Sequence, residues 1–272
     1  MADEVGYYRE GSVSVAVYDV VEGALIGAGV SACCGDLAFY RALAAGCAGP
    51  VLEVGTGTGR VAWALAEAGH AVVGVDLSAA MLARAEAKGA ALPAEARARV
   101  RFVRQDMTRL DLGRRFALIL VPHRTFNHVT DAAGQRAALE AMRRHLEPGG
   151  RLVLHLYAPS LRDLVPDTAA APQILQTGGA ATGETVRWSI VGKESDLEAQ
   201  TVATTVRFTV LAPDGAVRAD GRETVAVRWA ARQEMRYLAE LCGLEVEALH
   251  GDFLGGAPGP DKDQVWVLRA AP

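Results

Sequence analysis

Side chains that could bind or transform a ligand stand directly after several short apolar segments of this 272-residue chain. Three glycines, Gly55, Gly57 and Gly59, follow the apolar segment 51–54 and precede a segment of helical composition. Glycine lets a ligand approach the backbone closely, and the first amides of a helix carry the positive end of its dipole. The stretch 51–60 therefore predicts a binding loop between a buried strand and a helix.

Two acidic residues occupy corresponding places further along the chain. Asp76 follows segment 71–75 and stands 17 residues after Gly59, and Asp106 follows segment 100–104. In a doubly wound nucleotide-binding fold, an acid at about this position binds the ribose hydroxyls. Either acid alone could be a helix cap or an ordinary loop residue, so the prediction depends on their occurring together.

Histidines follow the fourth and fifth apolar segments. His123 and His128 lie in the loop after 116–121, and His155 lies near the end of segment 152–157. Imidazole can remove a proton from a hydroxyl or an ammonium near neutral pH. We expect His123 to be the catalytic base, with His128 and His155 as further catalytic candidates. The alternative for each is a buried histidine that only packs and hydrogen-bonds.

Neither a metal, a nucleic acid nor a membrane is expected as a partner. The histidines lack HxE or HExxH spacing, and the four cysteines form no CxxC pair, so we predict reduced thiols and no metal site. The formal net charge of −4 does not favour nucleic acid. The first residues are acidic, unlike a signal peptide, and no apolar run reaches the length of a membrane span. We therefore expect a cytoplasmic protein.

A parallel sheet would bring these residues to one edge. The segments 51–54, 71–75, 100–104, 116–121 and 152–157 are continuously apolar and alternate with segments of helical pattern. That order is typical of an α/β fold with helices on both faces of the sheet. We expect helices near 58–68, at 79–87 with Ser78 as the cap, at 132–146, and from Asp36, with Asp36 itself as the cap.

The chain changes character after Tyr157. Residues 158–184 are rich in proline and glycine and lack periodicity, which predicts a loop that gates the site. Three antiparallel strands are predicted between 185 and 229, with an apolar face formed by Trp188, Phe208 and Trp229. That face could bound an acceptor pocket, form core, or make a homodimer interface. A helix at 231–242 and two final strands complete the pattern.

Four motifs in this order resemble those of the class I S-adenosylmethionine-dependent methyltransferases. They are Glu53-x-Gly-x-Gly-x-Gly59, Asp76-Leu-Ser, Gln105-Asp-Met and Pro148-Gly-Gly. The sequence looks most like the bacterial small-molecule branch, which includes sugar N-methyltransferases and glycine or sarcosine enzymes. The resemblance implies a Rossmann-like, doubly wound, seven-stranded sheet with an antiparallel β insertion between strand five and the last helix.

The resemblance also implies a division of the chain. Residues 1–35 would form an N-terminal arm and lid, and 36–157 the cofactor-binding core. Residues 158–230 would form the loop and the antiparallel acceptor lid, and 231–272 the last helix and two strands of the core sheet.

The cofactor implied by the resemblance is S-adenosylmethionine, with S-adenosylhomocysteine as the product. Gly55, Gly57 and Gly59 would wrap its methionine part, while Asp76 would bind ribose. The other cofactor-binding residues implied are Tyr18 over the sulfonium, Glu53 and Thr56 at the loop, Leu77 and Met81 beside the adenine, Asp106 and Met107 holding it, and Val121 at the end of strand four.

The expected function is methyl transfer by in-line displacement to an N or O atom of a small molecule, in secondary metabolism such as antibiotic biosynthesis. One alternative is a cyclase or a non-catalytic protein that binds the same cofactor. An NAD-dependent dehydrogenase is disfavoured, because the loop does not read GxGxxG and no tyrosine is followed four residues later by lysine.

Overall fold

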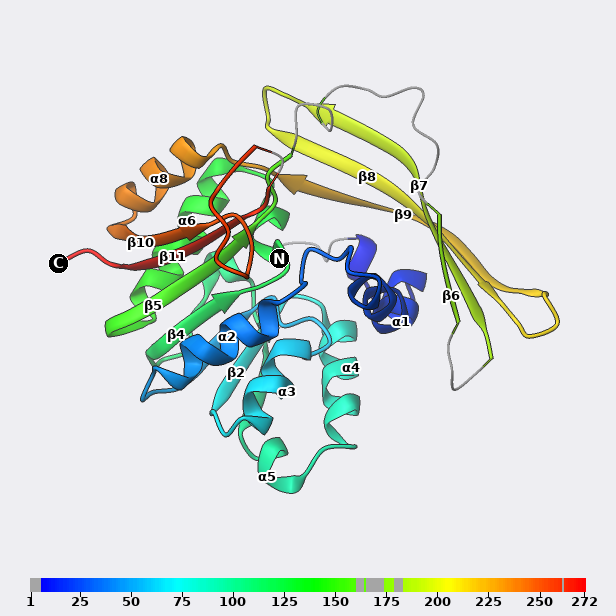
Figure 1. Cartoon of the computed structure of the whole chain (residues 1–272), viewed down its shortest axis with the longest axis horizontal. Coiled ribbons are helices and arrows are strands. Elements are labelled where there is room, and N and C mark those ends of the chain that lie inside the picture. Colours follow the sequence, from blue (N-terminus) through cyan, green and yellow to red (C-terminus); the bar gives the residue numbers. More distant parts are fainter. Residues whose placement is uncertain (1–5, 160–163, 165–173, 179–182, 261) are drawn as a thin grey trace.

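Two sheets and their helices make up the computed structural model, which describes residues 6–159, 164, 174–178, 183–260 and 262–272 (Figure 1). One sheet has seven strands in the order β10-β11-β5-β4-β1-β2-β3, and the other has four strands in the order β6-β7-β8-β9. The seven-stranded sheet and the antiparallel insertion predicted from the sequence are both confirmed.

The seven-stranded sheet reverses its order between β1 and β4. Its parallel strands are β1 (Val51–Val54), β2 (Val72–Asp76), β3 (Val100–Arg104), β4 (Phe116–Val121) and β5 (Leu146–Leu156). The antiparallel strands β11 (Gln264–Ala270) and β10 (Leu244–His250) extend it beyond β5. Doubly wound sheets bind ligands at the carboxyl ends of the strands where the order reverses.

Helices cover both faces of this sheet. Tyr40 of α2 (Asp36–Ala45) and Leu65 of α3 (Arg60–Glu67) pack against one face. Leu139 of α6 (Ala132–Arg144) and Met235 of α8 (Arg232–Leu241) pack against the other. The remaining elements here are α4 (Ala79–Gly89), α5 (Ala94–Arg97) and the 3-10 turns η2 (Met107–Arg109) and η3 (Thr125–His128).

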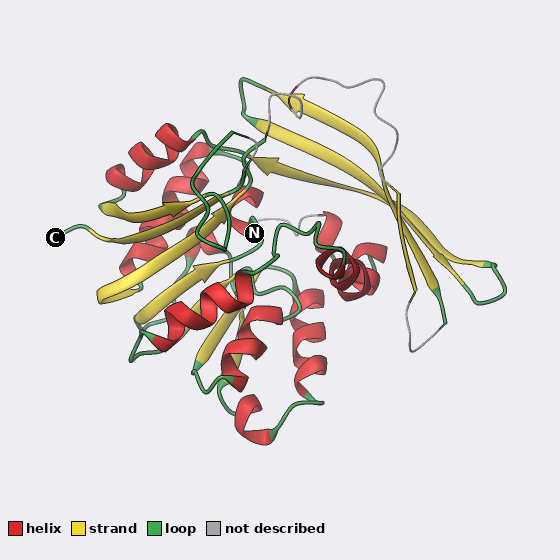
Figure 2. Ribbon diagram, in the orientation of Figure 1, coloured by secondary structure: helices red, strands yellow, loops and turns green. Residues whose placement is uncertain are grey.

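The four-stranded sheet extends away from the seven-stranded one (Figure 2). It consists of β6 (Ile174–Gly178), β7 (Thr185–Asp196), β8 (Thr201–Leu211) and β9 (Val217–Arg228). The N-terminal helix α1 (Val13–Gly27), preceded by the turn η1 (Gly6–Tyr8), packs on it through Val17 and Val21, which contact the cluster around Phe208. The helix therefore lies between this sheet and the half of the molecule that contains the seven-stranded sheet (Figure 1).

The structure differs from the sequence-based expectations in two elements. Asp36 lies in the first turn of α2 rather than at its cap, which is Gly35, because its carboxylate binds Arg60 of α3. The strand β6 lies in the segment predicted to be a structureless loop, most of which is outside the described residues. Phe208 is core under α1, which is one of the alternatives open for that face and excludes an acceptor pocket on that part of the sheet.

The rest of the insertion follows the predicted pattern, and its last two strands meet at the turn Pro213-Asp-Gly, where the Gly215 amide donates to the Ala212 carbonyl. In the described part of the chain, no helix is both long enough and apolar enough to cross a membrane.

Candidate active site

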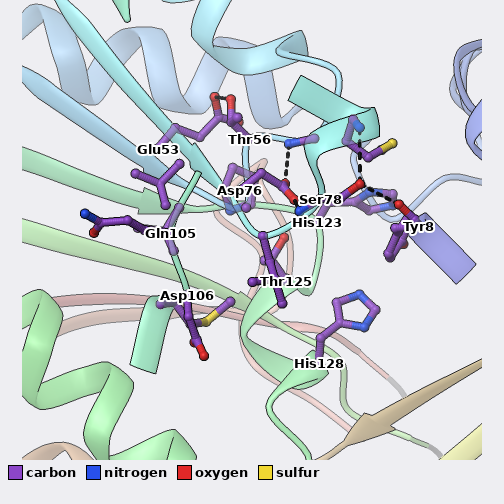
Figure 3. A pocket seen from close by; sticks show the side chains of 18 of the residues that line it. Tyr8, Glu53, Thr56, Asp76, Ser78, Gln105, Asp106, His123, Thr125 and His128 are labelled. Atoms are coloured by element: carbon purple, nitrogen blue, oxygen red, sulfur yellow. Dashed lines mark hydrogen bonds between the residues drawn. The ribbon is translucent and has the colours of Figure 1, made fainter. Parts of the chain in front are cut away.

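A cavity of about 540 Å³ opens at the carboxyl ends of β1, β2 and β4. Its walls come from the glycine loop, from the segments after β2 and β3, from the loop after β4, and from Tyr8 and Tyr18 of the N-terminal segment (Figure 3). Sites for small molecules and cofactors have volumes of this order and occur at this place in doubly wound sheets.

The glycine loop is held rigidly against β2. The amides of Gly55 and Thr56 donate to the Val75 carbonyl at 2.7 and 2.9 Å. Gly55 has φ of 73°, and a Cβ there would stand 2.0 Å from the Thr125 side chain. Only glycine fits that position, so the loop can pass directly beneath the segment that follows β4.

Glu53 places a buried carboxyl at the floor of the cavity. It is 2 % exposed, and its Oε2 accepts a hydrogen bond of 2.7 Å from the Thr56 hydroxyl. Burial raises the pKa of Glu53 to about 8, although the Thr56 hydrogen bond and the Arg60 charge act in the opposite direction. A cationic ligand group near this carboxyl would stabilise its ionised form.

Asp76 is fixed in position by two backbone amides. Its Oδ2 accepts from the Gly57 amide at 2.8 Å, and its Oδ1 accepts from the Ser78 amide at 2.9 Å. Ser78 in turn caps α4 by accepting from the Met81 amide, and its hydroxyl donates to the Tyr8 carbonyl (Figure 3). The acid at the end of β2, the glycine loop and the N-terminal segment are thus joined at one wall of the cavity.

The segment after β3 forms a second acidic wall. Asp106 Oδ1 accepts from both the amide and the hydroxyl of Thr108 at 2.8 Å. Asp106 therefore caps η2, as one interpretation of the sequence had it, and it also lines the cavity. Apolar groups that could enclose a flat ring line the cavity too, and they are Leu77, Met81 and Met107.

The charged side chains that line the cavity fit a sulfonium cofactor better than a pyrophosphate. Four acids line it, Glu53, Asp76, Asp106 and Asp131, whereas its arginines are Arg60 and Arg109. The Arg60 guanidinium is already paired with Asp36. A ligand with an ammonium, a sulfonium and ribose hydroxyls matches these groups, while two phosphates would face an excess of carboxylates.

Comparison with known proteins agrees with this fit. A model described as a methyltransferase domain matches residues 51–150. The chain is 29 % identical over 210 residues to the cypemycin N-terminal methyltransferase of a Streptomyces species, which covers 75 % of this chain and 76 % of that protein. It superposes on the CcbJ methyltransferase of Streptomyces caelestis with a TM-score of 0.75 and 28 % identity, covering 99 % and 100 % of the two chains.

Residues 51–150 therefore form a methyltransferase domain, and the chain is similar to S-adenosylmethionine-dependent methyltransferases over nearly its whole length. The fold alone is also shared with the sugar N-methyltransferase KedS8 of a Streptoalloteichus species, at a TM-score of 0.71 and 21 % identity over 100 % of this chain and 96 % of that one. Solved structures that share this fold hold S-adenosylmethionine or S-adenosylhomocysteine.

The loop after β4 brings two histidines, His123 and His128, to the part of the methyltransferase's cavity that Tyr18 also lines. His123 and Arg124 both have left-handed backbones, with φ of 50° and 61°. His123 Nδ1 lies 3.1 Å from the Tyr18 hydroxyl and its Nε2 lies 3.6 Å from Glu22 Oε2. Burial lowers the pKa of His123, while the Glu22 carboxylate acts to raise it.

His128 is the second histidine at this end. Burial, together with His123, lowers its pKa to about 4, although a hydrogen bond with the Ala226 backbone opposes that shift. Its ring stands edge-on to Tyr8 with the centroids 5.5 Å apart. His128 Nδ1 is buried and has no hydrogen-bond partner among the described residues. The His123 and His128 side chains are therefore both neutral at pH 7.

The structure places most of the predicted cofactor residues at the cavity. Those that line it are Tyr18, Glu53, Gly55, Thr56, Gly57, Asp76, Leu77, Met81, Asp106 and Met107.

Three predicted site residues do not line the cavity. Gly59 caps α3 with φ of 77°, and a Cβ there would meet the Trp63 ring at 2.9 Å, so this glycine serves helix packing. Val121 is wholly buried in the core under α6. His155 is also fully buried and binds Asp263 Oδ2 through Nε2 at 2.8 Å, so the catalytic role predicted for it is not supported.

The structure adds several residues that the sequence did not single out. Glu22, Tyr8 and Thr125 all lie at or against the cavity. Glu22 could have been found from its spacing, because it stands four residues after Tyr18 on α1 and so shares a helix face with it. No comparable signal exists for Thr125, whose role follows from its contact with Gly55.

Proposed function

We propose that this methyltransferase transfers a methyl group to a nitrogen atom of a small natural-product intermediate. The observation that carries the proposal is the neutral, polar acceptor end of the cavity, where His123, His128 and Tyr18 meet. The names of the similar proteins support it, since one is an N-terminal methyltransferase and one a sugar N-methyltransferase.

Bound S-adenosylmethionine supplies a methyl group that is already activated on a positively charged sulfur. The task of the protein is then to align the acceptor and exclude water. In our proposal Gly55 and Gly57 hold the methionine part, Asp76 the ribose, and Asp106 with Met107 the adenine. Tyr8 and Tyr18 line the cavity from the N-terminal segment.

Neutral imidazoles suit an amine acceptor. A cationic histidine would repel both the sulfonium and a partly protonated amine, and the lowered pKa of each histidine prevents this at neutral pH. A buried polar atom without a partner needs a physical explanation, and an N–H of the acceptor would satisfy His128 Nδ1. The nitrogen lone pair would then be free for the methyl group.

His123 receives a different role from the base expected from the sequence. Tyr18 contacts one of its ring nitrogens and Glu22 faces the other, so we assign His123 the role of positioning Tyr18.

The contacts from Tyr18 through His123 to Glu22 also give a second candidate function. A hydroxyl acceptor could pass its proton through Tyr18 and His123 to Glu22, which would favour O-methylation.

A paired-substrate assay separates the two functions. The protein is incubated with S-adenosylmethionine and with amine and hydroxyl versions of the same amino sugar or peptide, and methylated product is measured by mass spectrometry. We expect methylation of the amines only. His128→Ala should lower kcat about 5- to 150-fold, because leaving the buried acceptor N–H without its partner costs about 1–3 kcal/mol.

His128→Asn is the matched variant, because its amide oxygen can still accept a hydrogen bond, and it should keep most of the activity. Preferential methylation of the hydroxyl versions would contradict N-methylation. Cofactor binding without any S-adenosylhomocysteine formation across the panel would favour a non-catalytic binding protein.

A further inference from the structure

A group of metal-binding side chains lies behind the acceptor end of the cavity. One ligand atom each from Glu22, Cys33 and His123 lies within 4.8 Å of the other two. Glu22 is 8 % exposed and Cys33 is 2 % exposed, so these are not solvated surface groups. We propose that Glu22, Cys33 and His123 bind a zinc ion.

The types of ligand select zinc among the common divalent ions. A thiolate and an imidazole are ligands that zinc accepts and that calcium and magnesium do not prefer. Three protein ligands with one position left open is a common arrangement for zinc. A thiolate and a carboxylate together would also balance the charge of the ion, so the buried site would be electrically neutral.

The distances allow the site to form with small movements. Tetrahedral zinc with bonds of about 2.0–2.3 Å separates its ligand atoms by roughly 3.4–3.8 Å. His123 Nε2 and Glu22 Oε2 are already 3.6 Å apart. The remaining separations are at most 4.8 Å, so they need to close by about 1 Å. Rotation of the Cys33 and Glu22 side chains suffices for a change of this size.

Residues around the cluster already orient two of the ligands. The Ser31 hydroxyl donates to Glu22 Oε1 and accepts from the Cys33 amide. His123 Nδ1 contacts the Tyr18 hydroxyl at 3.1 Å, which leaves Nε2 as the nitrogen that faces Glu22. Metal-binding histidines usually hydrogen-bond through their second nitrogen in this way, and metal-binding carboxylates are also hydrogen-bonded.

The ion would connect three segments that are distant in the sequence. Glu22 comes from α1, Cys33 from the segment between α1 and α2, and His123 from the loop after β4. Zinc would therefore fasten α1 over the cavity. It would also fix the His123 tautomer with the proton on Nδ1, which then donates to the Tyr18 oxygen. The Tyr18 proton is left free to point toward a ligand.

Metal content tests the proposal without any acceptor, so its outcome is independent of the proposed N-methylation. The protein is purified without a polyhistidine tag, loaded with Zn²⁺, freed of excess ion and measured by mass spectrometry. We expect about one equivalent per chain. Cys33→Ser should lose it, and Cys34→Ser, whose side chain is outside the cluster, should keep it.

Cobalt substitution identifies the ligand. The Co²⁺-loaded protein should show a thiolate-to-cobalt charge-transfer band that is absent in Cys33→Ser and present in Cys34→Ser. Ser31→Ala should keep the metal but weaken its binding about 10- to 100-fold, as expected for an orienting residue. Should Cys33→Ser fail to fold, Glu22→Gln replaces it, with the same loss of zinc expected.

Two results would overturn the proposal. One is a wild-type protein that binds less zinc than a stoichiometric amount under these conditions. The other is a Cys33→Ser or Glu22→Gln variant that folds and binds zinc as tightly as the wild type.

Discussion

At the scale of single residues, the site combines acids whose surroundings differ sharply. Asp76 accepts hydrogen bonds from two backbone amides, which fix the direction of its carboxyl group. Glu53 accepts one hydrogen bond from Thr56 and is buried, so its pKa rises to about 8. The two carboxyl groups therefore differ in kind, because burial governs Glu53 at the floor of the cavity and backbone hydrogen bonds hold Asp76 at its wall.

Glu53 makes the stability of the ligand-free protein depend on pH. Its pKa in the folded state, about 8, exceeds its ordinary value of 4.5. The folded state thus holds a proton that the unfolded state releases, so stability is full below pH 4.5 and falls as the pH rises toward 8. We expect Glu53→Gln to flatten the dependence of the unfolding free energy on pH, by about 3–5 kcal/mol across this range.

Urea unfolding at several pH values measures this effect. Glu67→Gln, at the end of α3, is a suitable control because its carboxyl is exposed, and it should leave the pH dependence unchanged. An identical pH dependence in the wild type and Glu53→Gln would show that Glu53 ionises normally in the folded protein.

At the scale of elements, α1 is held by contacts to both halves of the molecule. Asp19 on α1 binds the Thr58 hydroxyl of the glycine loop and Lys88 of α4. At its N-terminus, the amides of Val13 and Ser14 donate to Glu223 Oε1 of β9 at 2.8 and 3.2 Å. The helix therefore links the four-stranded sheet to the cofactor loop.

The Glu223 contact predicts how firmly α1 is held. A carboxylate at a helix N-terminus interacts favourably with its dipole, and Glu223→Ala leaves two amides without their acceptor. We expect a loss of about 1–3 kcal/mol in stability and faster amide hydrogen exchange along α1. Glu194→Ala on β7, where the side chain is exposed, is the matched control.

Hydrogen-exchange mass spectrometry compares the two variants. Unchanged protection of residues 13–27 in Glu223→Ala, with normal protection elsewhere, would exclude the role of Glu223 as the anchor of this helix.

At the same scale, strand geometry explains which site residues could be predicted. Side chains alternate between the two faces of a strand, so a residue at the end of a strand is as often turned into a helix layer as toward the ligand. Val121 joins Ile119 in the core under α6. The His155 side chain lies on the same face of β5 as that of Val153, and its ring centroid is 4.8 Å from that of Phe253. Composition and spacing alone do not reveal these directions.

At the scale of the whole molecule, the sequence indicates the elements better than the contacts between them. The continuous apolar segments predicted the parallel strands, because both faces of such a sheet are buried. The strand β6 was not predicted because it is a short edge strand, held mainly by pairing with β7. The contact between Tyr18 and His123 joins residues 105 positions apart, and no local pattern reports such a contact.

The central claim is that the cavity at the glycine loop binds S-adenosylmethionine through Asp76. Isothermal titration calorimetry of the intact protein with S-adenosylmethionine and with NAD tests it most directly. We predict saturable binding of S-adenosylmethionine and none of NAD. In Asp76→Ala the affinity should fall about 10- to 100-fold, since hydrogen bonds to a charged group are worth about 1.5–3 kcal/mol. Tight binding of NAD without binding of S-adenosylmethionine, or an unchanged affinity in Asp76→Ala, would contradict the account.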